Sequence, residues 1–337
     1  RSVIIRSNES GHIRENLYAV DLKTGRRTLL DNGVGVHRAQ LSPNGTLLRD
    51  TWSSPTTYRN IVVRSTERPR ETLRLLEAAD PWREFTMPRV ESGSITAADV
   101  KPVHFDPNKQ YPTIVYVYGG PHATNVKESW NYQARPWEYY MANRDYVLFI
   151  LDNRGSGDRG FEFESCTHRH LGRIEMADQM QGVKYLSSLP FVDTTRIGVH
   201  GWSFGGFMTT NLMLSHPEVF KVGVAGGPVL DWKYYEAMYG ERYMETPQTN
   251  PEGYAEASMV GHAAKLKGRL QIIVGYNDPT CVLQHSLAFL RACEDAGTQP
   301  DYFVYPGQGH NMAGHDMIHL HERITRYFED HLKPLRK

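Results

Sequence analysis

The segment that most constrains the fold is a glycine-flanked serine between a strand-like and a helix-like stretch. The chain reads Gly201-Trp202-Ser203-Phe204-Gly205-Gly206 after the apolar run 196–200 and before the helical stretch 207–216. A serine on a sharp strand-to-helix turn has a strained backbone, and flanking side chains would collide with the adjacent strand and helix. This turn is the nucleophile elbow, which exposes the serine hydroxyl to a base. The pattern therefore predicts Ser203 as a nucleophile.

From about residue 85, strand-like and helix-like stretches alternate. Six dense apolar runs predict strands, at residues 113–118, 146–151, 196–200, 222–225, 270–274 and 302–305. Helical periods occupy residues 172–189, 282–296 and 316–332, and the second places Leu283, Leu287 and Leu290 on one stripe. Strands buried on both faces and separated by helices indicate a mostly parallel sheet with helices on both faces. With the elbow, this predicts an α/β-hydrolase fold over residues 81–337.

Residues 1–80 instead read as short strands separated by turns, with turn signals at 23–25, 31–33 and 43–45. Even spacing of strands and turns is typical of an all-β repeat, and a propeller blade takes roughly 40–50 residues. We therefore expect this region to be one or two blades of a partial β-propeller whose other blades precede the chain. A small β-domain packed on the α/β domain is the alternative.

Composition excludes several classes of function. The chain has 38 Lys and Arg against 38 Asp and Glu, so no basic field favours nucleic acid. No apolar stretch reaches the roughly 20 residues of a membrane span, and the start lacks a signal-peptide layout. The three cysteines, Cys166, Cys281 and Cys293, argue against a disulfide framework and lack a metal-binding spacing. No metal and no cofactor are expected.

A serine nucleophile needs a base, usually a histidine oriented by a carboxylate, and in α/β-hydrolases the order is Ser, then Asp or Glu, then His. Asp278 follows the predicted strand 270–274 in a loop, and His310 follows the strand 302–305 in the glycine-rich loop 306–310. Both positions fit this order, although Asp278 could instead cap the next helix. The sequence therefore predicts Ser203, Asp278 and His310 as a catalytic triad.

An acyl-transfer site also needs donors for the tetrahedral oxyanion. One is the backbone N–H of the residue after the nucleophile, here Phe204. The other should follow the strand 113–118, where Tyr118 stands before Gly119 and Gly120 and can present its phenol. The alternative for Tyr118 is a core tyrosine at a strand end.

Taken together, these motifs resemble the prolyl oligopeptidase family of serine peptidases, in its dipeptidyl peptidase IV branch. The motifs that carry the resemblance are Val117-Tyr-Gly-Gly-Pro121, Asp152-Asn-Arg-Gly-Ser-Gly157, the elbow, and the aspartate and histidine loops. Within the branch, long phrases around the elbow and residues 301–312 are most similar to bacterial prolyl tripeptidyl aminopeptidases. The resemblance implies a hydrolase domain under a propeller, and cleavage after proline near the N-terminus of short peptides.

The resemblance also implies a flat aromatic pocket for proline, the S1 pocket, and a carboxylate that binds the substrate's ammonium group. Positions that match the pocket are Val229, Trp232, Tyr235 and Tyr239, although this run could also be an ordinary buried helix turn. Glu236 matches the ammonium anchor of the tripeptidyl group; a surface glutamate on a helix over 234–239 is the alternative. Cys281 stands where an apolar wall residue of the pocket is expected, and a thiol can serve as a small hydrophobe.

Three functions compete. Release of Xaa-Xaa-Pro tripeptides leads, because the loop Asp278-Pro279-Thr280 lacks the Asp-Asn pair usual in the dipeptidyl branch. Release of Xaa-Pro dipeptides is the second hypothesis, and a non-catalytic binding protein on the same fold is a distant third. A lipase or esterase is conceivable from the fold alone. Likeness to secreted bacterial peptidases favours a periplasmic or secreted location and leaves a homodimer open.

Overall fold

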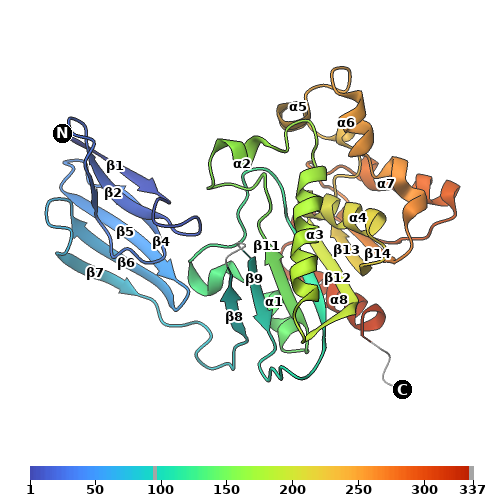
Figure 1. Cartoon of the computed structure of the whole chain (residues 1–337), viewed down its shortest axis with the longest axis horizontal. Helices are drawn as coiled ribbons and strands as arrows, with labels where there is room; N and C mark the ends of the chain where they lie inside the picture. The colour runs from blue at the N-terminus through green and yellow to red at the C-terminus, as the bar shows by residue number, and fades with distance from the viewer. Residues whose placement is uncertain (94–96, 334–337) are drawn as a thin grey trace.

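A computed structural model describes residues 1–93 and 97–333 of the chain. The strands form three sheets, two small ones at the N-terminal end and a large one in the rest of the chain (Figure 1). The large sheet has eight strands in the order β15-β14-β13-β12-β10-β11-β9-β8. Their bounds are β8 Arg89–Ser92, β9 Ala97–Lys101, β10 Tyr111–Tyr116, β11 Val147–Leu151, β12 Val192–Trp202, β13 Phe220–Gly226, β14 Arg269–Gly275 and β15 Asp301–Tyr305.

The six strands from β10 to β15 pair in parallel, whereas β9 is antiparallel to both of its neighbours. These six coincide with the six predicted strands, and β8 and β9 were not predicted. The sheet is therefore mixed at one edge and parallel elsewhere, as in an α/β-hydrolase.

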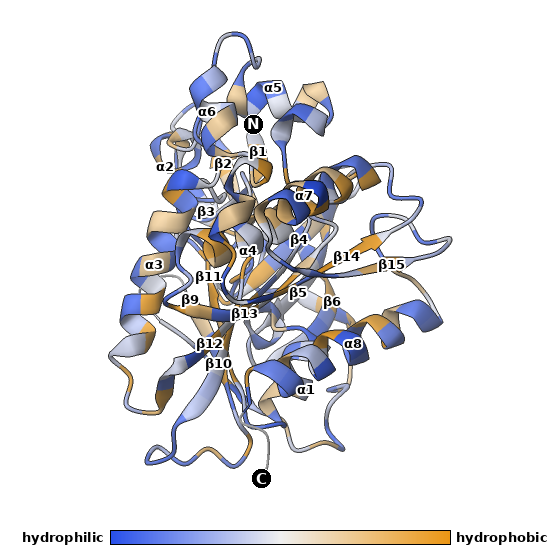
Figure 2. Cartoon of the chain, turned by 90° about the vertical axis from the view of Figure 1, so that its right-hand side faces the viewer, coloured by the Kyte–Doolittle hydropathy of each residue, from blue (hydrophilic) through white to orange (hydrophobic). Residues whose placement is uncertain are grey.

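Helices cover both faces of this sheet, as the apolar runs predict. Residues of α3, α4 and α7 belong to one buried cluster, and residues of α1 and α8 belong to another. In Figure 2, α3 and α8 alternate between hydrophilic and hydrophobic colours, because each buries one side and exposes the other. The helices are η1 Trp130–Gln133, α1 Pro136–Ala142, α2 Phe161–Ser165, α3 Arg173–Ser187, α4 Phe204–Ser215, η2 Trp232–Tyr234, α5 Ala237–Met244, α6 Pro251–Glu256, η3 Val260–Lys265, α7 Leu283–Ala296 and α8 His315–His331.

The N-terminal strands form a three-stranded and a four-stranded antiparallel sheet. The first contains β1 Ser2–Ser7, β2 Asn16–Asp21 and β3 Arg27–Leu29; the second contains β4 Val36–Leu41, β5 Leu47–Ser54, β6 Thr57–Ser65 and β7 Thr72–Glu77. The second is a simple meander, in which each strand pairs with the next. Strand β7 was not predicted, and its residues are all exposed.

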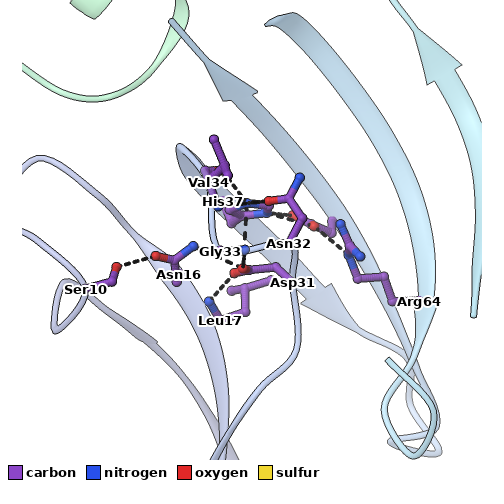
Figure 3. A network of polar contacts seen from close by, with 10 residues as sticks. Ser10, Asn16, Leu17, Asp31, Asn32, Gly33, Val34, His37 and Arg64 are labelled. Carbon is purple, nitrogen blue, oxygen red and sulfur yellow. Dashed lines mark hydrogen bonds and ion pairs between the residues drawn. The ribbon is translucent and has the colours of Figure 1, made fainter. Parts of the chain in front are cut away.

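A buried polar network joins the two small sheets (Figure 3). Asp31 accepts hydrogen bonds from the backbone of Leu17 at 2.6 Å and the side chain of Asn16 at 3.0 Å, both in β2. In β4, His37 Nδ1 contacts Asp50 Oδ2 at 2.9 Å, and Arg64 Nε donates to the same oxygen at 2.9 Å. Because the network is almost fully buried, removing one charged partner would leave the others buried and unpaired, which would destabilise the sheets.

Ion pairs connect the N-terminal sheets to loops at the carboxyl ends of β10 and β11. Lys127 pairs with Glu15 and lies 3.1 Å from Asp158, and Arg14 pairs with Glu128. The N-terminal sheets therefore lie against the edge of the large sheet to which its parallel strands point.

Candidate active site

Ser203 sits on the predicted elbow, between the end of β12 and the start of α4. Its φ of 62° and ψ of −118° are strained for a residue with a side chain. Its N–H donates to Gly226 O at 2.8 Å, which fixes the turn against β13. A Cβ on Gly205 would lie 2.2 Å from Val117 O, so only glycine fits there. The predicted steric reason for the glycines therefore holds in the structure.

The other predicted residues follow parallel strands at the same edge of the sheet. Tyr118 follows β10, Ser203 follows β12, Asp278 follows β14 and His310 follows β15. The carboxyl edge is where open α/β sheets bind ligands. The topology thus collects at one edge residues that are almost 200 positions apart in the chain.

Asp278 and His310 form a direct pair. His310 Nδ1 lies 2.7 Å from Asp278 Oδ2. The other oxygen, Oδ1, accepts the N–H groups of Thr280 and Cys281 at 2.8 Å each. The carboxylate side chain is fully buried, whereas that of His310 is 18% exposed. This geometry places the histidine proton on Nδ1 and leaves Nε2 as the free base.

Trp202 ties the nucleophile to the histidine loop, a role that the sequence did not reveal. Its Nε1–H donates to the backbone oxygen of His310 at 2.8 Å. Because Trp202 directly precedes Ser203, the position of the elbow determines the position of the histidine loop. In the sequence, the tryptophan of the elbow motif was the signal that could have indicated this link to the histidine loop.

The two predicted oxyanion donors lie on adjacent segments. Phe204 is the first residue of α4, so its N–H has no acceptor within the helix. The half-buried Tyr118 ring packs on the Phe204 ring at 6.1 Å between centroids. Burial raises the pKa of Tyr118, so the phenol keeps its proton and can donate it in a hydrogen bond. A Cβ on Gly120 would lie 2.8 Å from Tyr118 Cε1, so glycine lets this loop close on the ring.

Asn153 supports the Tyr118 loop from behind. Its Nδ2 donates to Gly119 O at 3.0 Å, and its Oδ1 accepts from Gln179 Nε2 at 3.0 Å. Asn153 belongs to the Asp-Asn-Arg motif, but its role was not predicted. A buried polar group with its partners satisfied holds a backbone in one position.

Three predicted pocket positions, Trp232, Tyr235 and Tyr239, form one aromatic cluster with Phe204. Trp232 lies 5.5 Å from the Phe204 ring and stacks on Tyr239 at 6.0 Å, and Tyr235 meets Tyr239 edge-on at 5.3 Å. Val229 and Trp232 are buried, whereas Tyr235 and Tyr239 are partly open. Burial raises the pKa of Tyr235 to about 12, and Asp278 and Cys281 lie near enough to contribute. The cluster therefore adjoins the Asp278–His310 pair.

The alternative prediction of one helix over residues 234–239 is wrong, because the structure has two separate helices there. A 3₁₀ turn ends at Tyr234, Tyr235 is extended with a ψ of 160°, and α5 begins only at Ala237. The break turns the Tyr235 ring onto Trp232 and Tyr239 rather than along a helix face.

Comparison with known proteins gives the family. A family model described as the prolyl oligopeptidase family matches residues 132–335. The chain belongs to the prolyl oligopeptidase family. The recognition made from the motifs is confirmed, and so is the assignment to the serine peptidases.

Relatives within the family are dipeptidyl peptidases by name. A solved Bacteroides ovatus protein, described as a candidate dipeptidyl aminopeptidase IV, is 50% identical with a TM-score of 0.92, covering 95% of this chain and 47% of that one. Porphyromonas gingivalis dipeptidyl peptidase 4 is 34% identical with a TM-score of 0.92, covering 98% and 48%. Human dipeptidyl peptidase 8 is 32% identical over 77% of this chain and 30% of its own length. The chain therefore spans half or less of these relatives.

Glu236, the predicted ammonium anchor, is exposed at the N-cap of α5. Its side chain makes no capping hydrogen bond to that helix. Its charge contributes to the raised pKa of the neighbouring Tyr235, after burial and other nearby groups. The carboxylate thus lies beside Tyr235, at the rim of the aromatic cluster.

Cys281 lies beside the Asp278–His310 pair. Its side chain is buried. Burial raises the pKa of the thiol, and the charge of Asp278 adds to the rise. Its role as an apolar wall of the pocket stays a prediction, and its approach to the Asp278–His310 pair was not foreseen.

Two other histidines have partners of their own. His200 Nδ1 donates to Val224 O at 2.8 Å inside the sheet, and burial lowers its pKa to about 4. His122 pairs with Glu164 at 2.9 Å in another loop.

Among the described residues, no helix has the length and apolar character needed to cross a membrane.

Proposed function

We propose that this chain is the catalytic part of a serine exopeptidase that cleaves after proline. The observation that carries the proposal is the Asp278–His310 pair at 2.7 Å, at the same sheet edge as the strained Ser203. The aromatic cluster beside the pair supports proline as the residue before the cleaved bond. A rigid apolar ring gains most from flat aromatic walls.

In the proposed mechanism, Ser203 Oγ attacks the carbonyl carbon of the proline residue while His310 Nε2 takes its proton. Asp278 holds the tautomer and stabilises the imidazolium that forms. The Phe204 N–H and the Tyr118 hydroxyl donate to the oxyanion. His310 then returns the proton to the leaving amine, and water repeats the sequence on the acyl-enzyme.

In the proposed S1 pocket, the substrate's proline ring lies against Tyr235 and Tyr239, with Val229 and Trp232 behind them. The two tyrosines are partly open and the other two residues are buried. The rings of Trp232, Tyr235 and Tyr239 already pack on one another, which lowers the entropy cost of ordering them around a rigid proline ring.

For product length, we favour release of Xaa-Xaa-Pro tripeptides. An exposed carboxylate at the rim of the pocket can bind a free ammonium by a charge-assisted hydrogen bond. Glu236 supplies one, and the loop Asp278-Pro279-Thr280 lacks the Asp-Asn pair of the dipeptidyl branch. The names of the relatives favour Xaa-Pro dipeptides instead, so this is the second candidate.

Two measurements test the proposal. A fluorophosphonate probe should label the purified protein at Ser203 and leave Ser203→Ala unlabelled; failure to label favours a non-catalytic binding protein. Hydrolysis of Ala-Ala-Pro and Gly-Pro chromogenic substrates then separates the candidates. Faster cleavage of Gly-Pro would overturn the tripeptidyl assignment while leaving the serine peptidase in place.

We also propose that residues 1–80 are the last part of a β-propeller and residues 81–337 the hydrolase domain. The four-stranded meander of β4 to β7 has the form of one blade. The likeness to secreted peptidases supports a periplasmic or secreted location, which fractionation of the source cells would test.

A further inference from the structure

Three side chains at the active site have the chemistry of a metal site. Asp278, Cys281 and His310 each offer one ligand atom, and these atoms lie within 4.8 Å of one another. The sequence gave no hint of this set, because the lone thiol has no metal-binding spacing. The fold creates it by bringing the loops after β14 and β15 together.

The hydrogen bonds show which atoms of Asp278 and His310 are already occupied and which are free to bind a metal. Asp278 Oδ2 contacts His310 Nδ1 at 2.7 Å, and Asp278 Oδ1 accepts two backbone N–H groups. The carboxylate is therefore occupied, and His310 presents Nε2 as its free lone pair. A histidine that ligates a metal commonly donates its other N–H to a carboxylate in this way. Cys281 supplies the sulfur.

Charge also favours a dication. Asp278 has a fully buried carboxylate, and Cys281 is 1% exposed. A divalent cation offsets the carboxylate and the thiolate together. Sulfur and imidazole ligands select Zn²⁺ and similar thiophilic ions over Mg²⁺ and Ca²⁺.

We propose that Cys281 and His310, with Asp278 behind the histidine, form a reversible inhibitory site for a thiophilic divalent cation such as Zn²⁺. On binding, the Cys281 thiol loses its proton to solvent and a metal–sulfur bond forms. His310 Nε2 donates its lone pair to the metal. The inhibition, unlike the binding, rests on the proposed function, because a metal on Nε2 removes the general base.

Direct binding tests the site without any substrate. Titration of the purified chain with Zn²⁺ against a chromogenic chelator should show one site that Cys281→Val and His310→Ala each weaken at least tenfold. Cd²⁺ should give a thiolate charge-transfer band that is lost in Cys281→Val. Cys166→Ser, which alters a half-buried thiol in another loop, is the matched control and should bind like the parent. Circular dichroism checks that each variant is folded.

Inhibition is measured as the ratio of rates with and without Zn²⁺, each variant being compared with its own metal-free rate. Zn²⁺ should slow the parent enzyme and Cys166→Ser at least tenfold more than Cys281→Val, and Mg²⁺ should slow none of them. Equal Zn²⁺ affinity in the parent, Cys281→Val and His310→Ala overturns the proposal. Binding that depends on Cys281 and His310 in a protein without peptidase activity would refute the proposed function and leave the metal site standing.

Discussion

Trp202 Nε1 donates a 2.8 Å hydrogen bond to the backbone oxygen of His310, so the residue before the nucleophile holds the loop that carries the base. A general base must stay within hydrogen-bond reach of the group it deprotonates. The bond therefore transmits the position of the elbow to the His310 imidazole.

Trp202→Phe keeps an aromatic ring but removes the donor. We expect kcat to fall about fivefold with little change in KM, since a lost hydrogen bond is worth about 1 kcal/mol. Steady-state kinetics on the better chromogenic substrate measure both parameters. Trp137→Phe is the control, because it also loses an indole donor, but that donor bonds Thr325 of α8 at 3.0 Å and not the histidine loop. Equal losses of kcat in both variants would refute the role of Trp202.

Tyr118→Phe removes one proposed oxyanion donor while keeping the ring on Phe204. Loss of such a donor lowers kcat by roughly 10²- to 10³-fold, because the bond strengthens in the transition state. Tyr116→Phe removes another phenol hydroxyl from the same segment and should leave kcat nearly unchanged. An unchanged kcat in Tyr118→Phe would assign the second donor elsewhere.

Glu236→Gln tests the ammonium anchor. We expect KM for free tripeptidyl substrates to rise by about 10- to 100-fold, since hydrogen bonds between charged groups contribute about 1.5–3 kcal/mol. An N-acetylated substrate, which has no ammonium group, should show no difference between parent and variant. Glu241→Gln alters another exposed glutamate on α5 and serves as the control. A similar KM in both variants would place the anchor outside this helix.

Glu175 should make stability fall as pH rises. Burial raises its pKa from 4.5 to about 8, and Gly172 N–H donates to its Oε2 at 2.9 Å. Between these values the folded state keeps a proton that the unfolded chain has lost, so the free energy of unfolding falls with increasing pH. Thermal unfolding from pH 5 to 8 should show a flatter slope in Glu175→Gln than in the parent. Parallel curves would contradict the assignment.

Asp50→Ala tests the network between the two N-terminal sheets. The change leaves His37 and Arg64 buried without their shared carboxylate, so we expect a loss of about 3–5 kcal/mol in the N-terminal region. Urea unfolding, together with limited proteolysis of residues 1–80, would measure it. Arg68→Ala breaks the exposed pair with Glu71 and should change little.

Local sequence was sufficient where steric and chemical demands are local. The elbow at Ser203 needs glycine at a few adjacent positions, and the dense apolar runs coincide with strands β10 to β15 because a strand buried on both faces must be apolar. The order Ser203, Asp278, His310 follows from the connectivity of this fold, so three loops could be nominated before their contacts were known.

Local sequence did not predict which face of a helix or strand is buried. The sequence places Leu283, Leu287 and Leu290 on one stripe of α7, yet Leu287 is half exposed and the helix buries His285, Phe289 and Cys293. Hydrophobicity sets which residues can be buried, but the neighbouring elements decide which ones are. The exposed strand β7 escaped prediction for the same reason, since its pairing comes from β6.

The sequence by itself therefore determined the fold class, the family and the three residues expected to perform the chemistry, because each depends on short motifs or their order. Only the tertiary structure decided the 2.7 Å contact of Asp278 with His310, the bond from Trp202 to the histidine loop, and the approach of Cys281 to the Asp278–His310 pair. Such contacts join loops that follow different strands, and their distances depend on how the strands pair and the helices pack, which no local pattern encodes.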